Sequence, residues 1–193
     1  MAIRIEEDCW FGQCSAVMPG MYIGRGAIIC ANSVITRNVA PYEVHGSIPN
    51  HKIGERLNFS PPDHVNALSD RCLPYFYRGF HISQAELEYS RRSGVVSAGQ
   101  DACLVPANAN GKAVRLEGMY EGRDSGLTLD FSINGQSCGV FSLALGYFNL
   151  TIPVPMPNQD VPKPLRDYTV VELRAVAQTV GQFYGLSSAK LVA

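Results

Sequence analysis

The sequence has no long apolar run and no excess of charge of either sign. No apolar stretch of the 193 residues approaches the roughly 20 that a membrane span needs. The N-terminal MAIRIEEDCW lacks the apolar core of a signal peptide. Sixteen Lys and Arg face 17 Asp and Glu, for a net charge of −1, which argues against nucleic acid or an anionic membrane surface as partner.

Metal and nucleotide motifs are also missing from the sequence. The six cysteines form no CxxC pair and have no histidine nearby at zinc spacing, so we expect no metal site. Scattered cysteines of this kind are typical of free, buried thiols in the reducing cytoplasm, where we expect the protein. Neither a P-loop nor a GxGxxG motif occurs.

The stretch from Ile5 to Ala40 repeats every six residues. Apolar side chains recur at this spacing without exception: Ile5, Phe11, Val17, Ile23, Ile29 and Ile35. Neither the helix period of 3.6 nor the strand period of 2 produces such a repeat. A hexad repeat is typical of parallel β-helices, in which each hexad forms one face of a triangular coil. The repeat therefore predicts stacked coils that end near Val39, before Pro41 breaks the register.

The rest of the chain predicts two further regions. Residues 58–100 carry helix-start signals, which predict a helix over 60–74, and a helical turn at 83–88. They fit either a linker or the first packing element of the next domain. Residues 101–193 contain alternating, β-rich runs with the hairpin signal Asn134-Gly135 between two of them. The predicted fold is mainly all-β, with a short β-helix over 1–57, a helical linker over 58–100 and an antiparallel β-sandwich over 101–193.

The hexads and the residues after them resemble the last coils and exit loop of the hexapeptide-repeat acyltransferases. This family includes xenobiotic, galactoside and polysaccharide O-acetyltransferases. The matching pieces are DCWFG (8–12), PG (19–20), IGRGAIICANSVITRNVAPYEV (23–44) and GSIPNHKIGERL (46–57). The resemblance implies a left-handed β-helix, a homotrimer and acetyl-CoA as acyl donor. More weakly, the C-terminal part resembles β-sandwich modules that are appended to polysaccharide-biosynthesis enzymes.

The same resemblance implies a cofactor site and an acceptor site. The positions where the family lines pantetheine and the nucleotide hold Gly24, Ala31, Ser33, Thr36 and Arg37. Small residues at coil corners are equally what the turns themselves require. Arg37 and Arg56 suit phosphate groups, because guanidinium pairs well with dianions. Trp10 lies on the family's acceptor side, where its ring either stacks on a sugar or serves the core or a trimer interface.

A catalytic residue is harder to assign. In the family a histidine activates the acceptor hydroxyl, and it lies several hexads before DCWFG. Among the four histidines of this chain, His45 in the exit loop is the candidate. Two functions stay open. One is a hexapeptide-type O-acetyltransferase acting on a sugar or polysaccharide hydroxyl, incomplete or weakly active without that histidine region. The other is a non-enzymatic trimer with a structural or carbohydrate-binding role.

Overall fold

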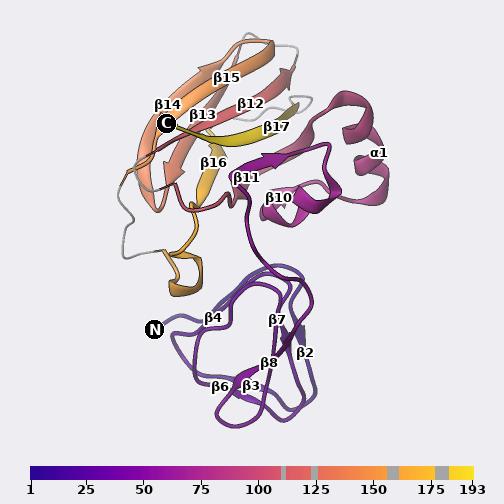
Figure 1. The fold of residues 1–193 in the computed structure, drawn as a ribbon, viewed down its shortest axis with the longest axis vertical. Helices are drawn as coiled ribbons and strands as arrows, with labels where there is room; N and C mark the ends of the chain where they lie inside the picture. The colour runs from indigo at the N-terminus through magenta and orange to yellow at the C-terminus, as the bar shows by residue number, and fades with distance from the viewer. Residues whose placement is uncertain (110–111, 123–125, 156–160, 177–182) are drawn as a thin grey trace. The chain divides into compact units, whose positions relative to one another are not determined.

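The computed structural model describes residues 1–109, 112–122, 126–155, 161–176 and 183–193. The chain divides into two compact units (Figure 1). The first comprises Met1–Ser60 with Pro162–Leu165, and the second comprises Pro61–Val161 with Arg166–Ala193. Both units are built mainly from β-strands, which confirms the predicted all-β class. No helix among the described residues is long and apolar enough to cross a membrane.

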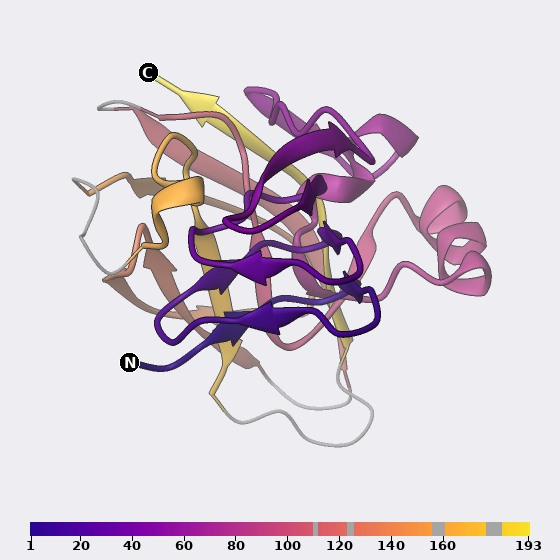
Figure 2. The same ribbon diagram turned by 90° about the horizontal axis from the view of Figure 1, so that it is seen from below.

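The first unit is a parallel β-helix, as the hexads predict. Arg4 lies opposite Tyr22 and Trp10 opposite Ile28, so three hexads complete one coil. Figure 2 shows these short strands stacked in the indigo part of the chain. Each strand of the first coil pairs in parallel with one of the second: β1 (Arg4–Ile5) with β4 (Tyr22–Ile23), β2 (Trp10–Phe11) with β5 (Ile28–Ile29), and β3 (Ala16–Val17) with β6 (Val34–Ile35).

The axial side chains of the hexads form the core of the β-helix. In the second coil they are almost fully buried and pack as one cluster: Ile23, Ala27, Ile29, Ile35 and Val39. Burying one such aliphatic side chain stabilises the fold by about 1.5–3 kcal/mol. In the first coil Ile5 and Phe11 are 49% and 41% exposed. The second coil therefore supplies most of the apolar stabilisation.

Parallel pairing continues beyond Val39, so the predicted end of the coil is wrong. β7 (Glu43–Gly46) lies parallel to β5, with His45 opposite Ile29. Pro41 interrupts the hexad count at a corner, but the chain returns to the same face afterwards. β8 (His51–Glu55) then pairs antiparallel with β7, and this change of direction ends the β-helix.

The second unit contains one nine-stranded antiparallel sheet. Seven strands follow the order β14-β13-β16-β11-β17-β12-β15, while β9 pairs with β17 and β10 pairs with β11. The strands are β9 (His64–Asn66), β10 (Arg78–Phe80), β11 (Val96–Leu104), β12 (Ala113–Glu121), β13 (Leu127–Ile133), β14 (Gln136–Leu143), β15 (Gly146–Pro153), β16 (Val171–Ala175) and β17 (Phe183–Val192).

This sheet bends over on itself. β14 and β15 stand at opposite ends of the strand order, yet only Ala144 and Leu145 separate them in the chain. The two ends must therefore come together, which makes two layers with the apolar core between them. β11 takes part in both layers, because residues 96–98 pair with β17 and residues 101–104 pair with β16. Along β13 the inward side chains alternate with the outward ones, as period 2 requires.

Residues 61–100 belong to the second unit, give its sheet β9, β10 and the start of β11, and do not form a separate linker. The helix predicted over 60–74 is wrong in its first half, because His64–Asn66 is β9. Val65 of β9 pairs with Ala189 and is fully buried, so sheet pairing outweighs the local helix signals. Only Asp70–Tyr75 is helical there, as the 3₁₀-helix η1.

The helical turn predicted at 83–88 is confirmed as α1 (Gln84–Ser93). Ser83 and Glu86 form a capping box at its N-terminus, which satisfies backbone donors that the first turn leaves free. Gly94 adopts a left-handed conformation with φ 75° after the last turn and closes the helix.

Other predictions for the second unit have mixed outcomes. The Asn134-Gly135 hairpin is confirmed between β13 and β14, with positive φ at both residues. The alternation of the β-rich runs predicts Val140 and Leu145 on the apolar face, but they are 60% and 56% exposed, because β14 stands at the end of the strand order and Leu145 follows it. The Pro-rich run 156–164 predicts a loop; residues 156–160 lie outside the described residues, and Lys163–Leu165, which belongs to the first unit, forms the short 3₁₀-helix η2.

All six cysteines are free, as predicted, but most of them are not buried. Cys72 and Cys103 lie in the interior of the second unit, whereas Cys14 is exposed. Cys9 is half-buried and its Sγ donates to the Gly24 carbonyl at 3.2 Å. Burial raises the pKa of the Cys9 thiol and so keeps it protonated.

Candidate functional site

Two successive corners of the β-helix present the exposed members of the predicted cofactor set. Ala31 follows β5, while Thr36 and Arg37 follow β6, and all three are exposed. Among the residues that the structure describes, none forms a hydrogen bond or ion pair with the Arg37 guanidinium. Arg37 is therefore a cation that can meet a ligand phosphate without first breaking a contact.

Gly24 and Ser33 of the same set face the coil instead of solvent. A Cβ atom on Gly24 would lie 2.5 Å from the backbone nitrogen of Pro41, so the close approach of the next coil requires glycine. Ser33 is fully buried, and its Oγ donates to the Ala31 carbonyl at 3.5 Å. The Ser33 side chain therefore does not reach a molecule bound outside the β-helix, and Gly24 has no side chain to offer.

Arg56 ties the exit strand back to the first two coils. Its guanidinium donates to the Gly26 carbonyl at 3.0 Å and to the Asp8 carbonyl and carboxylate, both at 3.2 Å. A ligand phosphate would have to compete with these three contacts. Of the two predicted phosphate-binding arginines, Arg37 is the one that is free of such contacts.

His45 occupies an axial position and is 6% exposed. Its Nε2 lies 2.9 Å from Oε2 of Glu43, and its Nδ1 lies 2.9 Å from Nδ2 of Asn50. The Asn50 amide can only donate there, so Nδ1 accepts and Nε2–H donates to Glu43. Both ring nitrogens are used within the unit, and neither is left to take a proton from an acceptor hydroxyl.

Asn50 connects this histidine to the corner that carries Arg37. Its Oδ1 accepts hydrogen bonds from the backbone N–H groups of Thr36 at 2.8 Å and Arg37 at 3.1 Å. Its side chain is buried, with 1% of the residue exposed. Sequence reasoning missed Asn50, because its partners lie 13 and 14 positions away across an irregular loop that no periodicity describes.

Glu43 completes the network on the other side of His45. Its carboxylate also pairs with Nζ of Lys52 at 3.1 Å, and Lys52 in turn contacts Glu55. Burial alone would raise the pKa of Glu43, but the hydrogen bonds from His45 and Lys52 outweigh it and lower the pKa below its ordinary value. Glu43 is therefore held as a carboxylate that orients the imidazole.

Trp10 points outward from β2, opposite Ile28 of β5, and is 67% exposed. The indole is therefore not a core residue of this unit. An exposed indole on a regular strand provides a flat apolar surface, which suits either a sugar ring or a second protein surface.

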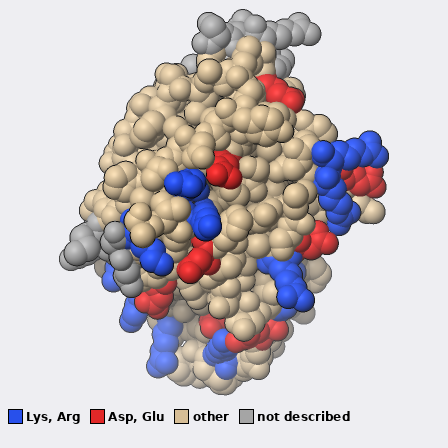
Figure 3. Space-filling model, turned by 45° about the horizontal axis from the view of Figure 1, so that its top comes forward, with Lys and Arg blue, Asp and Glu red and all other residues tan. Residues whose placement is uncertain are grey.

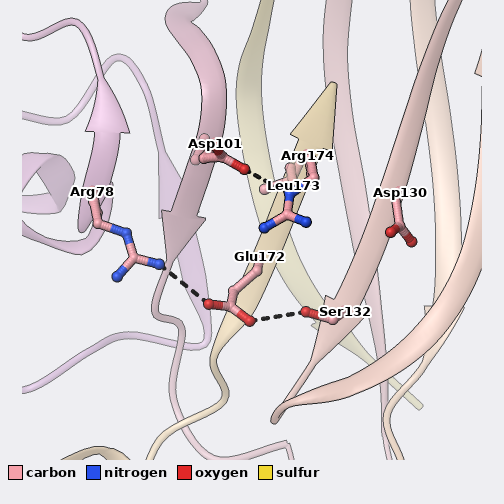
Figure 4. A pocket seen from close by; sticks show the side chains of 8 residues that line it. Arg78, Asp101, Asp130, Ser132, Glu172, Leu173 and Arg174 are labelled. Carbon is pink, nitrogen blue, oxygen red and sulfur yellow. Dashed lines mark hydrogen bonds and ion pairs between the residues drawn. The ribbon is translucent and has the colours of Figure 1, made fainter. Parts of the chain in front are cut away.

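A groove of about 350 Å³ crosses the second unit over β10, β11, β16 and β13 (Figure 4). Glu172 at its centre accepts from Arg78 at 3.2 Å and from Ser132 at 2.9 Å, while Arg174 pairs with Asp101 at 2.8 Å. The contacts of Glu172 with Ser132 and of Arg174 with Asp101 join neighbouring strands, and cross-strand pairs of this kind stabilise a sheet by about 0.2–1 kcal/mol each. The contact of Arg78 with Glu172 reaches from β10 across β11 to β16. The groove is best explained as a charge network that holds the strands together.

The segment GQSCG (135–139) fits the G-x-S-x-G pattern of serine hydrolases. That pattern needs a strand, a sharp turn and a helix to expose its serine. Here the segment belongs to the hairpin between β13 and β14, so Ser137 is a strand residue without that geometry.

Charge and metal-binding groups give no further site in the described part of the chain. On the face shown in Figure 3, positive and negative side chains alternate and do not gather into a patch of one sign. Within the described ranges, no group of three or more His, Cys, Asp or Glu could hold a metal ion.

Comparison with known proteins finds acetyltransferases. The chain is 44% identical over 53 residues to a chloramphenicol acetyltransferase of Klebsiella aerogenes, which covers 28% of this chain and 25% of that protein. It is 43% identical over 54 residues to a probable macrolide acetyltransferase of Lysinibacillus sphaericus, covering 28% and 30%. The chain thus spans about a quarter to a third of the length of these relatives. No family model matches the sequence.

Distant likenesses also occur among solved structures. A galactoside acetyltransferase in complex with coenzyme A matches 42% of this chain and 35% of its own, at 24% identity and a TM-score of 0.27. The CBM36-1 domain of a multidomain xylanase from the hindgut metagenome of Trinervitermes trinervoides matches 48% of this chain and 70% of its own, at 15% identity and a TM-score of 0.36.

Proposed function

We propose that the β-helix unit forms the acyl-donor side of a hexapeptide-type O-acetyltransferase, which moves an acetyl group from acetyl-CoA to a hydroxyl of a sugar or polysaccharide. The observation that carries this proposal is the 44% identity to a chloramphenicol acetyltransferase, in a chain whose hexads fold as a β-helix. The protein would act in the cytoplasm, since its six free cysteines suit a reducing compartment.

Three exposed residues fit coenzyme A. The Arg37 guanidinium would pair with a phosphate, the Thr36 hydroxyl would hydrogen-bond to the cofactor, and the small Ala31 would let an extended chain approach the corner. When bound, the cofactor supplies the acetyl group as an activated thioester. Asn50 fixes the Thr36–Arg37 corner and so positions these contacts.

The proposal includes a homotrimer whose subunits complete the site. Large apolar side chains of the β-helix unit face solvent, including Trp10, Ile48 at 68% and Ile53 at 55% exposure. Contact with another copy would bury them. Because both nitrogens of His45 are engaged, the base for the acceptor hydroxyl would come from a partner subunit or chain, and this chain alone would turn over weakly.

Isothermal titration of the full chain with acetyl-CoA tests the donor site directly. We expect saturable binding, weakened about tenfold or more in Arg37→Ala, because a charge-assisted contact is worth about 1.5–3 kcal/mol. Arg71→Ala, which removes an exposed arginine of the second unit, should bind like the wild type. No binding by the wild type, or equal loss in both variants, would overturn the proposal.

Light scattering after size exclusion tests the assembly separately. A mass of three chains supports the trimer, and a monomer at micromolar concentration contradicts it. Release of free CoA thiol in the presence of sugar acceptors measures the turnover of this chain alone. Rapid, saturable turnover would refute the need for a base from elsewhere.

A further inference from the structure

The second unit has a cleft of about 610 Å³ between α1 and the strands beside it. Figures 1 and 2 both show α1 at the side of the sheet, next to β11. Pockets that bind small molecules commonly enclose about 300–1,000 Å³, so this cleft has room for a ligand of a few rings. None of the residues singled out in the β-helix unit takes part in it.

Two exposed aromatic rings border this cleft. Tyr89 on α1 is 46% exposed, and Phe183 at the start of β17 is 64% exposed. Both rings belong to ordered elements, which limits how far they can turn away from the opening. Exposed aromatic faces are costly to hydrate, and the C–H faces of a sugar ring cover such surfaces well.

Carboxylates stand beside the aromatic rings. Glu121 lies opposite Phe183 in the register of β12 and β17, so both side chains project from the same face of the sheet. Burial, the charge of Glu121 and a hydrogen bond to its carboxylate raise the pKa of the Tyr89 hydroxyl. A carboxylate accepts several hydrogen bonds, so Glu121 can also accept from a ligand. Glu86 also lines the cleft, although its carboxylate is occupied by the α1 cap and by His81 at 3.5 Å.

Close packing fixes the floor of the cleft at Gly99 of β11. A Cβ atom there would lie 3.3 Å from the Gly79 carbonyl oxygen and 3.7 Å from Nε2 of His81, so glycine lets both residues approach the strand. The Gly99 carbonyl accepts the buried Tyr184 hydroxyl at 2.8 Å, which fixes this part of the strand. The floor is therefore held in place by Tyr184 and lies close to His81.

The chemistry of these walls selects among ligand classes. An anionic ligand would meet the charges of Glu86 and Glu121, which repel it. A purely apolar ligand would strip water from those carboxylates without replacing the hydrogen bonds. A neutral saccharide avoids both costs, because its ring faces are apolar and its hydroxyls donate to carboxylates.

We propose that this cleft binds a neutral saccharide, with Tyr89 and Phe183 as stacking faces and Glu121 as an acceptor for sugar hydroxyls. The site lies in the second unit and does not depend on acetyl transfer by the first.

The test uses the full chain without acetyl-CoA. Neutral gluco-, manno-, galacto- and xylo-oligosaccharides of six sugars, with hyaluronan fragments as an acidic comparison, are examined by saturation-transfer NMR, and calorimetry gives the affinity of those that bind. We expect saturable binding of at least one neutral oligosaccharide and none of hyaluronan. Failure of every neutral oligosaccharide, or preference for hyaluronan, would overturn the proposal.

Variants locate the binding site. Tyr89→Ala and Phe183→Ala should each weaken binding about tenfold, and Glu121→Gln should weaken it measurably as well. Tyr147→Ala is the matched control, because Tyr147 is a 78% exposed aromatic of the same unit that does not line the cleft. Unchanged affinity in Phe183→Ala, or an equal loss in Tyr147→Ala, would refute the site. If only Trp10→Ala lost affinity for the oligosaccharide, the sugar would bind at the β-helix unit, and the proposed cleft would be refuted.

Discussion

Replacing Asn50 by alanine should destabilise the β-helix far more than the size of one side chain suggests. Asn50 is buried, and the three shortest hydrogen bonds of its side chain serve the backbone N–H groups of Thr36 and Arg37 and Nδ1 of His45; two longer ones join the Thr36 hydroxyl at 3.3 Å and the Arg37 carbonyl at 3.4 Å. Alanine leaves all three without their partner. The two backbone donors sit at an exposed corner where water can replace part of the loss, whereas His45 is buried.

The loss of unfolding free energy in Asn50→Ala can be derived from the hydrogen bonds that it removes. An ordinary hydrogen bond contributes about 0.5–1.5 kcal/mol, and a buried group that loses its partner costs about 1–3 kcal/mol. Two of the first kind and one of the second give about 2–6 kcal/mol. Since a domain has only about 5–15 kcal/mol of stability, Asn50→Ala should bring this unit close to unfolding.

Urea unfolding followed by the fluorescence of Trp10 measures this cost. Trp10 is the only tryptophan of the chain and lies in β2, so its emission reports on the β-helix unit. Asn38→Ala is the matched control, because Asn38 is exposed and its side chain accepts one backbone bond, from Tyr22 at 2.9 Å. We expect Asn38→Ala to lower the free energy of unfolding by about 0.5–1.5 kcal/mol, the contribution of one ordinary hydrogen bond. Equal shifts of the two midpoints would refute the role assigned to Asn50.

Three further predictions concern single positions. Gly24→Ala should cost about 1–3 kcal/mol of unfolding free energy through its backbone clash, whereas Gly54→Ala, whose Cβ would meet its nearest atom at 3.8 Å, should be tolerated; equal urea midpoints would contradict this. The lowered pKa of Glu43 gives a contribution that is complete above its ordinary value of 4.5 and disappears as pH falls through the folded value, so the urea midpoints of wild type and Glu43→Gln should differ at pH 6 and approach each other as the pH is lowered below 4.5. If the difference between the two urea midpoints did not change with pH, the role of the Glu43 carboxylate would be refuted. Cys14 should react first with Ellman's reagent in the native protein, and Cys14→Ser should remove that phase; a fast phase that survives would identify another accessible thiol.

The sequence predicts those parts of the fold that a short period controls. Ile23, Ile29 and Ile35 are recognisable as an axial ladder, because one side chain in six must point inward on every coil. The Asn134-Gly135 turn is equally local, since two residues with positive φ define it. In both cases the residues that determine the structure are close together in the sequence, so the pattern can be recognised there.

Structure that depends on distant pairing is not visible in the sequence. Val65 follows a good helix start, yet it is a strand residue because β17, more than a hundred positions later, offers it backbone partners. β17 itself escaped prediction, since the small residues Gly185, Ser188 and Ala189 interrupt the apolar alternation that its buried Leu186 and Leu191 would otherwise show.

The sequence likewise predicts some residues of the candidate site and misses others. Resemblance selected Arg37 and Thr36, which the structure leaves exposed, together with Ser33, which it buries. Corner positions look alike in a hexad, and only coordinates tell which side of the corner faces outward. Asn50 had no signal at all, because a buried amide in a loop obeys no period.

The double membership of β11 has a consequence for how the second unit melts. Its residues 96–98 hold one layer and its residues 101–104 hold the other, so neither layer can lose this strand alone. An intermediate with one intact layer would have to keep half of β11 in place while the other half is free. We therefore expect the unit to unfold as a single cooperative block, with no half-sandwich populated along the way.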